Sequence, residues 1–293
     1  MSSRITPLTD PAHGPNSRRL AWLASDADSI PIGTAFLRLF NSPEQEHLAE
    51  LTLGVHPAER RKRVGSRLLD AAVAAARADA RRCVIAQAEA DSPGDHFLPK
   101  RGFRKVLTLR FSRLPLADVD TTALARIVER PHAGYRLMSW HGTVPDDLAE
   151  TFADSRRAMD DMPMDDTDYG TVAWDVDRVR AAAKAVEERG DHLHTVVALA
   201  ASDESIVGFT ELVVPGDGKG DGQHYGTGVL PEHRGHGLGR WMKAESIRHA
   251  HERYPELGGL LTDTAAGNTH MRQINDSLGY TPTHTTHQYQ LHL

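Results

Sequence analysis

The chain has 293 residues, of which 40% are hydrophobic and 25% charged, and its formal net charge is −6. This length accommodates one large or two ordinary domains, and the composition is that of ordinary soluble protein. No apolar run of about eighteen residues occurs, so we expect no membrane-spanning helix and no membrane partner. We expect no nucleic-acid partner either, because the sequence lacks a basic stripe with interleaved aromatic residues.

The charge is divided unevenly along the chain. Residues 1–130 carry a net charge of +5 and residues 131–293 one of −11. The two parts either have solvated surfaces of different charge, or the acidic part attracts a cationic molecule. The single cysteine, Cys83, permits no intrachain disulfide and fits a reducing cytoplasm, which is where we expect the protein. Because Cys83 opens an apolar run, we expect a buried structural thiol and not a nucleophile.

The first part of the chain predicts strands around one helix. Residues 1–17 are polar and contain three prolines, so we expect a tail without regular structure. Val64, Leu68, Ala72 and Ala75 mark one face of a helix after an arginine-rich turn. The elements predicted here are strands at 18–24, 30–40 and 51–55, the helix from Val64, and strands at 83–88 and 105–114.

The second part begins after a linker and a short helical pattern at 116–130. Pro131-His-Ala-Gly134 is typical of a domain boundary, and 215–222 of a flexible loop. The elements predicted between and beyond them are a strand at 135–140, helices at 146–159 and 175–189, strands at 194–201 and 206–214, a central strand at 225–230 and a strand at 260–264.

The central strand runs into Val229-Leu-Pro-Glu-His-Arg-Gly-His-Gly-Leu-Gly-Arg240, where a helical pattern starts at once. Its glycines let the backbone approach a ligand closely, and the free N–H groups at a helix start favour a phosphate or pyrophosphate. Its arginines add fixed positive charge. A tight turn without a ligand is the plainer interpretation. A dinucleotide-binding fingerprint fits poorly, since no acidic residue closes a βαβ unit about twenty residues further on.

Val-x-Pro-x-x-Arg-Gly-x-Gly-x-Gly before a helix resembles the acyl-CoA signature of the GNAT superfamily of N-acyltransferases. Further on, Asn268-Thr-His-Met271 leads to Leu278-Gly279-Tyr280, which is similar to the segment that closes GNAT domains. The resemblance implies an α/β fold in which helices flank a mixed, mostly antiparallel sheet with splayed central strands. It implies acetyl-CoA as acyl donor and an amine as acceptor. The acyl-CoA contacts that it implies are Val229, Leu230, Arg234, Gly235, His236, Gly237, Leu238, Gly239, Arg240, Asn268 and Asn275.

The first part of the chain repeats the order of elements of the second, so the whole resembles a tandem-GNAT protein. We therefore expect a polar tail at 1–17, a degenerate GNAT-like domain at 18–130 and an acyltransferase domain at 131–293. In the N-terminal copy, Arg63 stands at the place of the first motif glycine, and the two helices that usually follow the first strand are missing. This copy is predicted to be non-catalytic. Its cluster from Arg60 to Arg63 either holds CoA phosphates or is a solvated face.

Acyl transfer to an amine needs a base that takes the proton from the ammonium. We consider three candidates, namely Glu211, His224 and Asp263. Glu211 lies on an apolar strand, where a buried carboxylate is costly unless it is paired, although it could also face solvent. His224 begins the central strand, and neutral imidazole suits a base near pH 7. Backbone amides near Val229 are expected to polarise the thioester carbonyl.

GNAT enzymes often use a tyrosine in the last helix to protonate the leaving thiolate. Counting from Asn268, Asn275 has that tyrosine's place, and in the N-terminal copy Leu98 has it, so the usual acid is in doubt. Asn268 and Asn275 either cap helices or bind the pantetheine arm. A non-catalytic acyl-CoA-binding or regulatory module is therefore the alternative function.

The acceptor would meet an acidic loop between the first two helices of the second part. Four of its aspartates are candidates for binding an ammonium group, although a solvated acidic loop is the plainer interpretation; they are Asp160, Asp161, Asp165 and Asp166. We expect a small cationic metabolite or antibiotic as acceptor, with a protein amine as alternative, and a homodimer is compatible with the sequence. We expect no metal, because His284, His287 and His292 fall on differing faces of a terminal strand and no cysteine motif is present.

Overall fold

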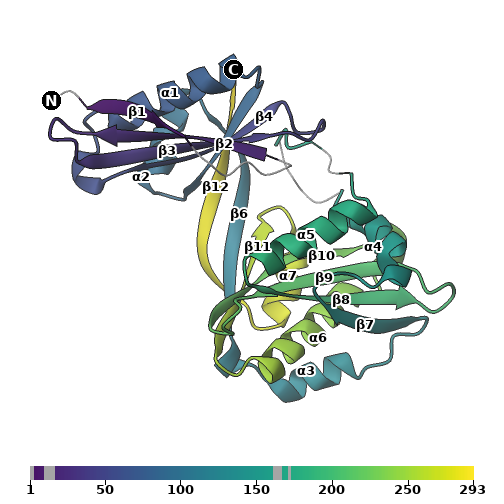
Figure 1. Ribbon diagram of the computed structural model, residues 1–293. Helices are drawn as coiled ribbons and strands as arrows, with labels where there is room; N and C mark the ends of the chain where they lie inside the picture. Colours follow the sequence, from purple (N-terminus) through teal and green to yellow (C-terminus); the bar gives the residue numbers. More distant parts are fainter. Residues whose placement is uncertain (1–2, 10–16, 161–166, 171–172) are drawn as a thin grey trace. The chain divides into compact units, whose positions relative to one another are not determined.

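The computed structural model describes residues 3–9, 17–160, 167–170 and 173–293 (Figure 1). The chain forms two compact units. Unit 1 comprises Met1–Thr108, Met164–Thr171 and Thr285–Leu293, and unit 2 comprises Leu109–Pro163 and Val172–His284. Among the described residues, no helix combines the length and the apolar character that crossing a bilayer requires.

Unit 1 is a sheet whose strands lie in the order β1-β2-β3-β4-β5-β12. Its strands are β1 (Arg4–Leu8), β2 (Ser17–Ser25), β3 (Pro31–Phe40), β4 (Leu48–Val55), β5 (Cys83–Glu89) and the end of β12 (Thr281–His292), and its helices are η1 (Pro57–Glu59), α1 (Val64–Ala78), α2 (Pro93–Phe97) and η2 (Pro99–Arg101). Helix α1 packs on β3 and β4 with Val64, Leu68, Leu69, Ala72 and Ala76 buried, which confirms the predicted helical face except that Ala76 replaces Ala75. Cys83 is fully buried, as expected, and burial raises the pKa of its thiol to about 11.

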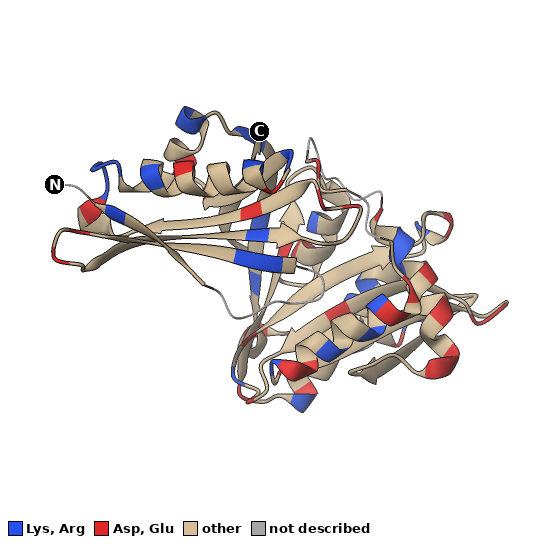
Figure 2. Cartoon of the chain, turned by 45° about the horizontal axis from the view of Figure 1, so that its top comes forward, with Lys and Arg blue, Asp and Glu red and all other residues tan. Residues whose placement is uncertain are grey.

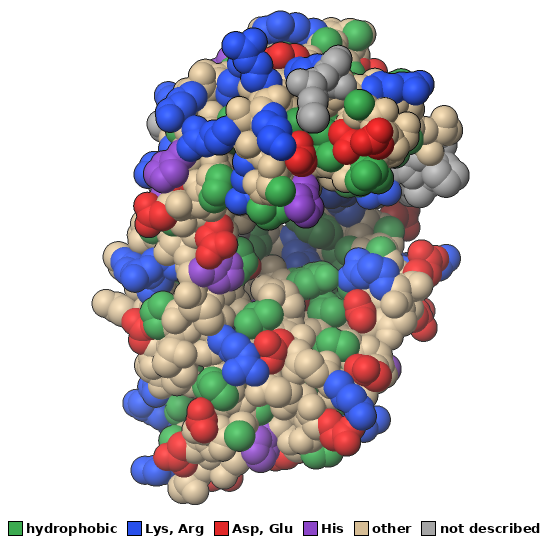
Figure 3. Space-filling model, turned by 90° about the vertical axis from the view of Figure 1, so that its left-hand side faces the viewer, with side chains coloured by type: hydrophobic (Ala, Val, Ile, Leu, Met, Phe, Trp, Pro, Cys, Tyr) green, Lys and Arg blue, Asp and Glu red, His purple; other side chains and the backbone are tan. Residues whose placement is uncertain are grey.

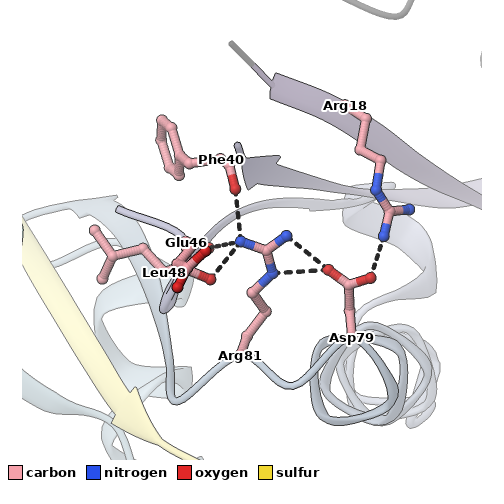
Figure 4. Close-up of polar contacts among 6 residues, drawn as sticks. All are labelled: Arg18, Phe40, Glu46, Leu48, Asp79 and Arg81. Atoms are coloured by element: carbon pink, nitrogen blue, oxygen red, sulfur yellow. Dashed lines mark hydrogen bonds and ion pairs between the residues drawn. The ribbon is translucent and has the colours of Figure 1, made fainter. Parts of the chain in front are cut away.

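Arg81, just before β5, holds several parts of unit 1 together (Figure 4). Its guanidinium donates to the backbone carbonyls of Phe40, Glu46 and Leu48 and to the carboxylate of Asp79. Asp79 also pairs with Arg18 on β2. Only 8% of the Arg81 side chain is exposed, so these charge-assisted bonds replace water that the group would otherwise keep.

In unit 2 the strands lie in the order β6-β11-β10-β9-β8-β7. Its strands are β6 (Arg104–Pro115), β7 (Tyr135–His141), β8 (His192–Ala200), β9 (Ile206–Val214), β10 (Gly220–Val229) and β11 (Leu257–Ala265). Its helices are η3 (Leu116–Asp118), α3 (Thr121–Val128), η4 (Asp146–Leu148), α4 (Ala149–Ser155), η5 (Arg156–Met159), α5 (Val176–Glu188), η6 (Pro231–His233), α6 (Leu238–Arg253) and α7 (Thr269–Ser277). The predicted fold class is confirmed in both units, since only β4–β5 and β10–β11 are parallel among the strand pairs described in register.

Several predicted boundaries need correction. Residues 4–8 are not a tail, because they form β1 and pair with β2. The predicted helix at 146–159 consists of three short pieces, η4, α4 and η5. Strand β10 begins at Gly220, within the predicted loop. At Gly222 an added Cβ would lie 3.1 Å from Leu260, so close packing of strands explains a glycine that resembles a loop signal.

The last strand predicted for the N-terminal copy also departs from expectation. Residues Leu109–Pro115 of β6 pair with β11 in unit 2, and residues Thr286–His292 of β12 pair with β5 in unit 1. Each unit thus takes strand residues from the other part of the sequence. The compact units divide within β6, between Thr108 and Leu109, whereas the boundary expected at residue 130 separates the two sequence repeats and stays a prediction.

Candidate active site

Two parallel strands separate in the middle of the sheet of unit 2. Strands β10 and β11 are paired from Gly220↔Leu257 to Gln223↔Leu261. Beyond that point β10 keeps only its pairing with β9, and β11 only its pairing with β6. A register shift at Tyr225 bends β10 where the two strands part. The splayed central strands that the sequence predicted are therefore present, and we call the space between them the split.

The backbone of Val229 faces the split. The Leu230 N–H donates to the Val207 carbonyl on β9 at 2.9 Å. Since successive residues of an antiparallel ladder point to opposite sides, the N–H and C=O of Val229 point away from β9. The Val229 carbonyl accepts from Arg234 Nε at 2.9 Å, which fits this orientation. The Val229 N–H is the group left to donate to a molecule in the split.

The loop after β10 has the conformation that its glycines predict. Gly235 has φ 84° and Gly237 φ 75°, both in the left-handed region, and Gly237 is the N-cap of α6. The first-turn N–H groups of a helix have no partner inside the helix, and the helix dipole adds positive potential there. A Cβ on Gly235 would meet nothing within 4 Å, so that position needs glycine for its backbone conformation and not for space. The loop therefore offers N–H groups to an anion.

Aromatic side chains outside the loop contact it and the start of α6. His132 stacks on Trp241 with ring centroids 4.1 Å apart and contacts the His236 carbonyl through Nδ1 at 3.0 Å. The Tyr135 hydroxyl lies 3.1 Å from His233 Nδ1. These contacts hold the loop in place without a ligand. Arg240 in the first turn of α6 is exposed to solvent.

Glu211 does not face solvent. Both of its carboxylate oxygens accept from the guanidinium of Arg156, and both residues are buried. The guanidinium also lies within 4.8 Å of the ring centroids of Phe152, Trp174 and Phe209. The pair is thus enclosed in an aromatic cage and joins η5 to β9. The expected role of Glu211 as a base stays a prediction.

His224 lies at the start of the split but is completely enclosed. Neither ring nitrogen has a hydrogen-bond partner among the described residues. Burial, with Lys243 nearby, lowers the pKa of His224 well below its usual value. The ring is therefore neutral near pH 7, yet it has poor access to a substrate.

Asp263 on β11 is accessible to solvent, and the pKa of its carboxyl group is raised. Its side chain keeps contact with solvent, and its Oδ1 lies 3.5 Å from Gln223 Nε2 across the split. Surrounding protein atoms raise the pKa of its carboxyl group, with a backbone hydrogen bond and Lys243 acting in the opposite direction. Of the three predicted bases, Asp263 is the one that is both reachable and unpaired with a cation.

The two faces of the sheet separate these groups. Gln223 pairs with Val213 and with Leu261, so it shares a face with Asp263, and Val213 packs against α5. His224 pairs with Leu212, which packs against α6 on the other face. Asp263 therefore lies on the α4–α5 face, and His224 on the α6 face. Tyr225, exposed at the bend of β10, is bound through its hydroxyl by Arg189, which follows α5.

Comparison with known proteins gives the family. The acetyltransferase (GNAT) family matches residues 3–103 and again residues 156–280. The chain belongs to this family. It is 30% identical over 249 residues to a mycothiol acetyltransferase from Nocardia farcinica, covering 83% of this chain and 75% of that protein. A mycothiol acetyltransferase from Thermobifida fusca is 28% identical over 280 residues, covering 92% and 82%.

Solved structures show the same fold. A tandem GNAT protein from the clavulanic acid biosynthesis pathway matches with a TM-score of 0.77 at 22% identity, covering 96% of this chain and 84% of that one. A GCN5-related N-acetyltransferase from Sphaerobacter thermophilus matches with a TM-score of 0.64 at 13% identity, covering 93% and 80%. The predicted tandem GNAT arrangement is confirmed, and the named relatives support an N-acetyltransferase.

Asn275, at the place of the GNAT tyrosine, belongs to a buried hydrogen-bond network. Asn275 Oδ1 accepts from Lys243 Nζ at 2.8 Å, and its Nδ2 donates to Thr264 Oγ1 at 3.1 Å. Asn275 is 3% exposed and Lys243 1%. Burial lowers the pKa of Lys243 to about 7. Asn268 caps α7 by accepting from the Met271 N–H.

Sequence reasoning missed Lys243, Arg156 and Tyr225. Lys243 could have been found, because Gly239, Lys243, Ser246 and Ala250 follow one buried stripe of α6. No local pattern marks Arg156 as the partner of Glu211, since 55 residues separate them.

The N-terminal GNAT copy keeps the backbone of the motif without its glycines. Strands β4 and β5 are paired only from Leu48↔Cys83 to Leu51↔Ala86 and then separate. Arg61 (φ 66°) and Arg63 (φ 67°) have the conformations of Gly235 and Gly237. Arg63 therefore stands at the place of the second motif glycine, and the prediction that it stands at the first was wrong. Lys and Arg side chains are numerous on unit 1 in the upper part of Figure 3. Eight residues separate β1 from β2, and seven of them lie outside the described residues.

The acidic loop is only partly visible. Asp161, Asp165 and Asp166 lie outside the described residues. Asp160 is exposed after η5, and Asp and Glu also recur on the helices and loops of unit 2 (Figure 2). The end of the loop belongs to unit 1, where Tyr169 packs edge-on against Phe40 and Asp168 lies near His47. The substrate-binding role of these aspartates stays a prediction.

Proposed function

We propose that the protein transfers an acetyl group from acetyl-CoA to the amine of a small molecule, at the split of unit 2. The observation that carries this proposal is the Val229 N–H, which faces an unpaired space directly before a glycine loop and a helix start. A thioester carbonyl that accepts from this N–H would be polarised, and the donor would stabilise the negative charge that develops on the carbonyl oxygen.

The loop would hold the pyrophosphate of the donor. Amides from Gly235 to Arg240 and the dipole of α6 favour an anion there, and Arg240 is free to add its charge. Gly239 lies where a Cβ would be 3.5 Å from Ile274, so the helix packs closely against α7 beneath the loop. The remaining predicted contacts, Leu230, Arg234, His236 and Leu238, would act mainly by shaping this turn, because Arg234 is bound to Val229 and the His236 carbonyl contacts His132.

Asp263 would act as the base. Its carboxylate would take a proton from the acceptor ammonium, directly or through water. The amine nitrogen would then form a bond to the thioester carbon, and the carbon–sulfur bond would break with its electron pair on the CoA sulfur. The surplus proton on the nitrogen would pass to this thiolate, directly or through water, to give the amide and the free CoA thiol. A raised pKa suits a carboxylate to accept a proton near neutral pH.

The acceptor is a small molecule in this proposal because similar proteins, 28% to 30% identical, are named mycothiol acetyltransferases. The acidic loop after η5 motivates a cationic acceptor, and the reducing environment that a buried single cysteine fits motivates a cytoplasmic location. A second candidate function, acyl-CoA binding without transfer, is favoured by the buried Asn275 in place of a tyrosine acid.

One set of variants separates these functions. We would titrate the full chain with acetyl-CoA by calorimetry and measure free thiol release with a panel of small amines. Gly237→Trp should abolish binding, whereas Gly190→Trp, at another left-handed glycine whose Cβ would meet nothing within 4 Å, should not. Asp263→Asn should bind acetyl-CoA normally but turn over about 10²- to 10⁴-fold more slowly, and exposed Asp276→Asn should behave as wild type.

Each outcome has a clear meaning. A stoichiometry near one that Gly237→Trp abolishes supports a single donor site in unit 2, and a stoichiometry near two assigns another to unit 1. Binding without thiol release for any amine would favour the binding module. No binding of acetyl-CoA by the wild type would refute the acetyltransferase proposal.

A further inference from the structure

Three histidines from distant parts of the sequence meet in unit 2. His141 is the last residue of β7, His194 lies on β8 directly opposite it in the ladder, and His249 lies on α6. Each histidine contributes one ring nitrogen, and these three nitrogens lie within 4.8 Å of one another. The expectation of no metal rested on spacing along the sequence, which cannot show such a cluster.

Two buried ring nitrogens of this cluster lack hydrogen-bond partners among the described residues. His194 is 2% exposed, and its Nδ1 has no hydrogen-bond partner among the described residues. The same is true of the buried Nε2 of His249. An unpaired buried nitrogen costs free energy comparable to a lost hydrogen bond, and an ion bound to both nitrogens would offset this cost.

The charge state of the cluster suits a cation. Burial, together with its two histidine neighbours, lowers the pKa of His194 to about 3, and burial also lowers the pKa values of His141 and His249. Each imidazole would bind the ion through an unprotonated ring nitrogen. Within the described part of the chain, two cations lie near the cluster. Arg248 is engaged by Glu245 and Glu252, and Arg253 lies over the ring of Tyr254.

We propose that His141, His194 and His249 form a binding site for a divalent transition-metal ion such as Zn²⁺. Three imidazoles fill three positions of a tetrahedral ion and leave the fourth to water, at the exposed side of His141. The ion would join the edge strand β7, strand β8 and helix α6, and would stabilise unit 2 independently of acetyl transfer.

Binding requires a small rearrangement that can be predicted. The rings of His194 and His249 are stacked with centroids 3.8 Å apart and planes 23° from parallel, so their in-plane lone pairs do not converge. Zinc–nitrogen bonds of about 2.0–2.1 Å place tetrahedral ligands about 3.4 Å apart. His141 is exposed and can move, and rotation of the His249 ring about its Cβ–Cγ bond would direct its lone pair to the ion.

The test uses the full chain without a histidine tag, after removal of metal by a chelator. We would titrate it with Co²⁺, following the visible bands of tetrahedral cobalt, and with Zn²⁺ by calorimetry. The wild type should bind one equivalent. Loss of one ligand should weaken binding by more than about tenfold in His141→Gln and His249→Gln, since even removal of a supporting group costs that much.

His251→Gln is the matched control, because His251 lies on α6 two residues from His249 and points to a different side of the helix. It should bind as wild type. His141 is exposed, so His141→Gln should fold even if a substitution of buried His194 does not. The proposal is overturned if the wild type binds no ion, if His141→Gln and His249→Gln bind as tightly as wild type, or if His251→Gln loses binding equally.

Discussion

Lys243 is a buried lysine that forms no ion pair with a carboxylate among the described residues. It donates a hydrogen bond to neutral Asn275 and lies 4.9 Å from the ring centroid of Tyr280. Its pKa is lowered from 10.5 to about 7 by burial. Between these pH values the unfolded chain holds a proton that the folded chain has lost, so the free energy of unfolding rises with pH across this window. Below about pH 7 the full cost of burying the charge is present.

Lys243→Met should therefore change the pH dependence of stability. The variant loses the donor to Asn275, which costs about 1–3 kcal/mol at every pH, but it no longer buries a charge. We compare the free energy of unfolding of the variant minus that of the wild type at two pH values. This difference should be about 2–3 kcal/mol higher at pH 6 than at pH 9. Urea unfolding at both pH values measures this difference. Exposed Lys184→Met is the control, and a pH-independent difference would contradict a lowered pKa.

At the scale of elements, the clamp around Arg81 makes unit 1 depend on one side chain (Figure 4). Arg81→Met keeps the apolar stem but leaves the carbonyls of Phe40 and Glu46 and the carboxylate of Asp79 without their donor. We expect a loss of about 2–4 kcal/mol in the free energy of unfolding. Arg81→Lys should recover only part of it, because an ammonium cannot reproduce the planar fork.

Chemical unfolding followed by circular dichroism measures this loss. Arg77→Met, at an exposed position in the last turn of α1, should change stability by less than about 0.5 kcal/mol. Equal stability of Arg81→Met and Arg77→Met would show that water can replace the clamp.

Elements with a strong local signal were predictable, and those decided by neighbours were not. The turn from Val229 to Gly239 was recognisable because left-handed residues at a helix start demand glycine. The same turn in unit 1 keeps two arginines in the left-handed region, where a non-glycine residue costs about 1–2 kcal/mol, so its conformation could not be read from residue type. Strand β10 appeared shorter than it is because Gly220 and Gly222 are turn residues by local preference.

The same limit explains the outcome for the candidate site. The approximate location of Glu211, His224 and Asp263 around the central strands followed from chain order. Their chemistry depended on partners far away in sequence, such as Arg156 for Glu211 and Lys243 for His224. The histidine cluster was missed for this reason too, since His141 and His249 are joined only by the folding of α6 onto the sheet.

At the scale of the whole molecule, the exchange of strands makes the sequence repeats differ from the compact units. Strand β6 follows the N-terminal repeat in sequence, but its residues Leu109–Pro115 pair with β11. Beyond Leu261, β11 is no longer paired with β10, and β6 is its remaining partner among the described strands. Helix α3, also before residue 131, contributes Leu124 to the core that includes Ile247 on α6. A fragment cut at the repeat boundary therefore loses a strand and a helix of unit 2.

Two fragments that differ only in this stretch test the consequence. Residues 131–293 should be largely insoluble or unfold without a cooperative transition, because β11 is left as an exposed edge and the apolar surface under α3 is uncovered. Residues 109–293 restore both elements and should be soluble, with a cooperative transition in thermal unfolding. Both fragments lack the partner of the end of β12 equally, so that difference cancels. If residues 131–293 alone unfold cooperatively at the same temperature as residues 109–293, β6 and α3 are dispensable, and the repeat boundary near residue 130 is also the boundary of independent folding.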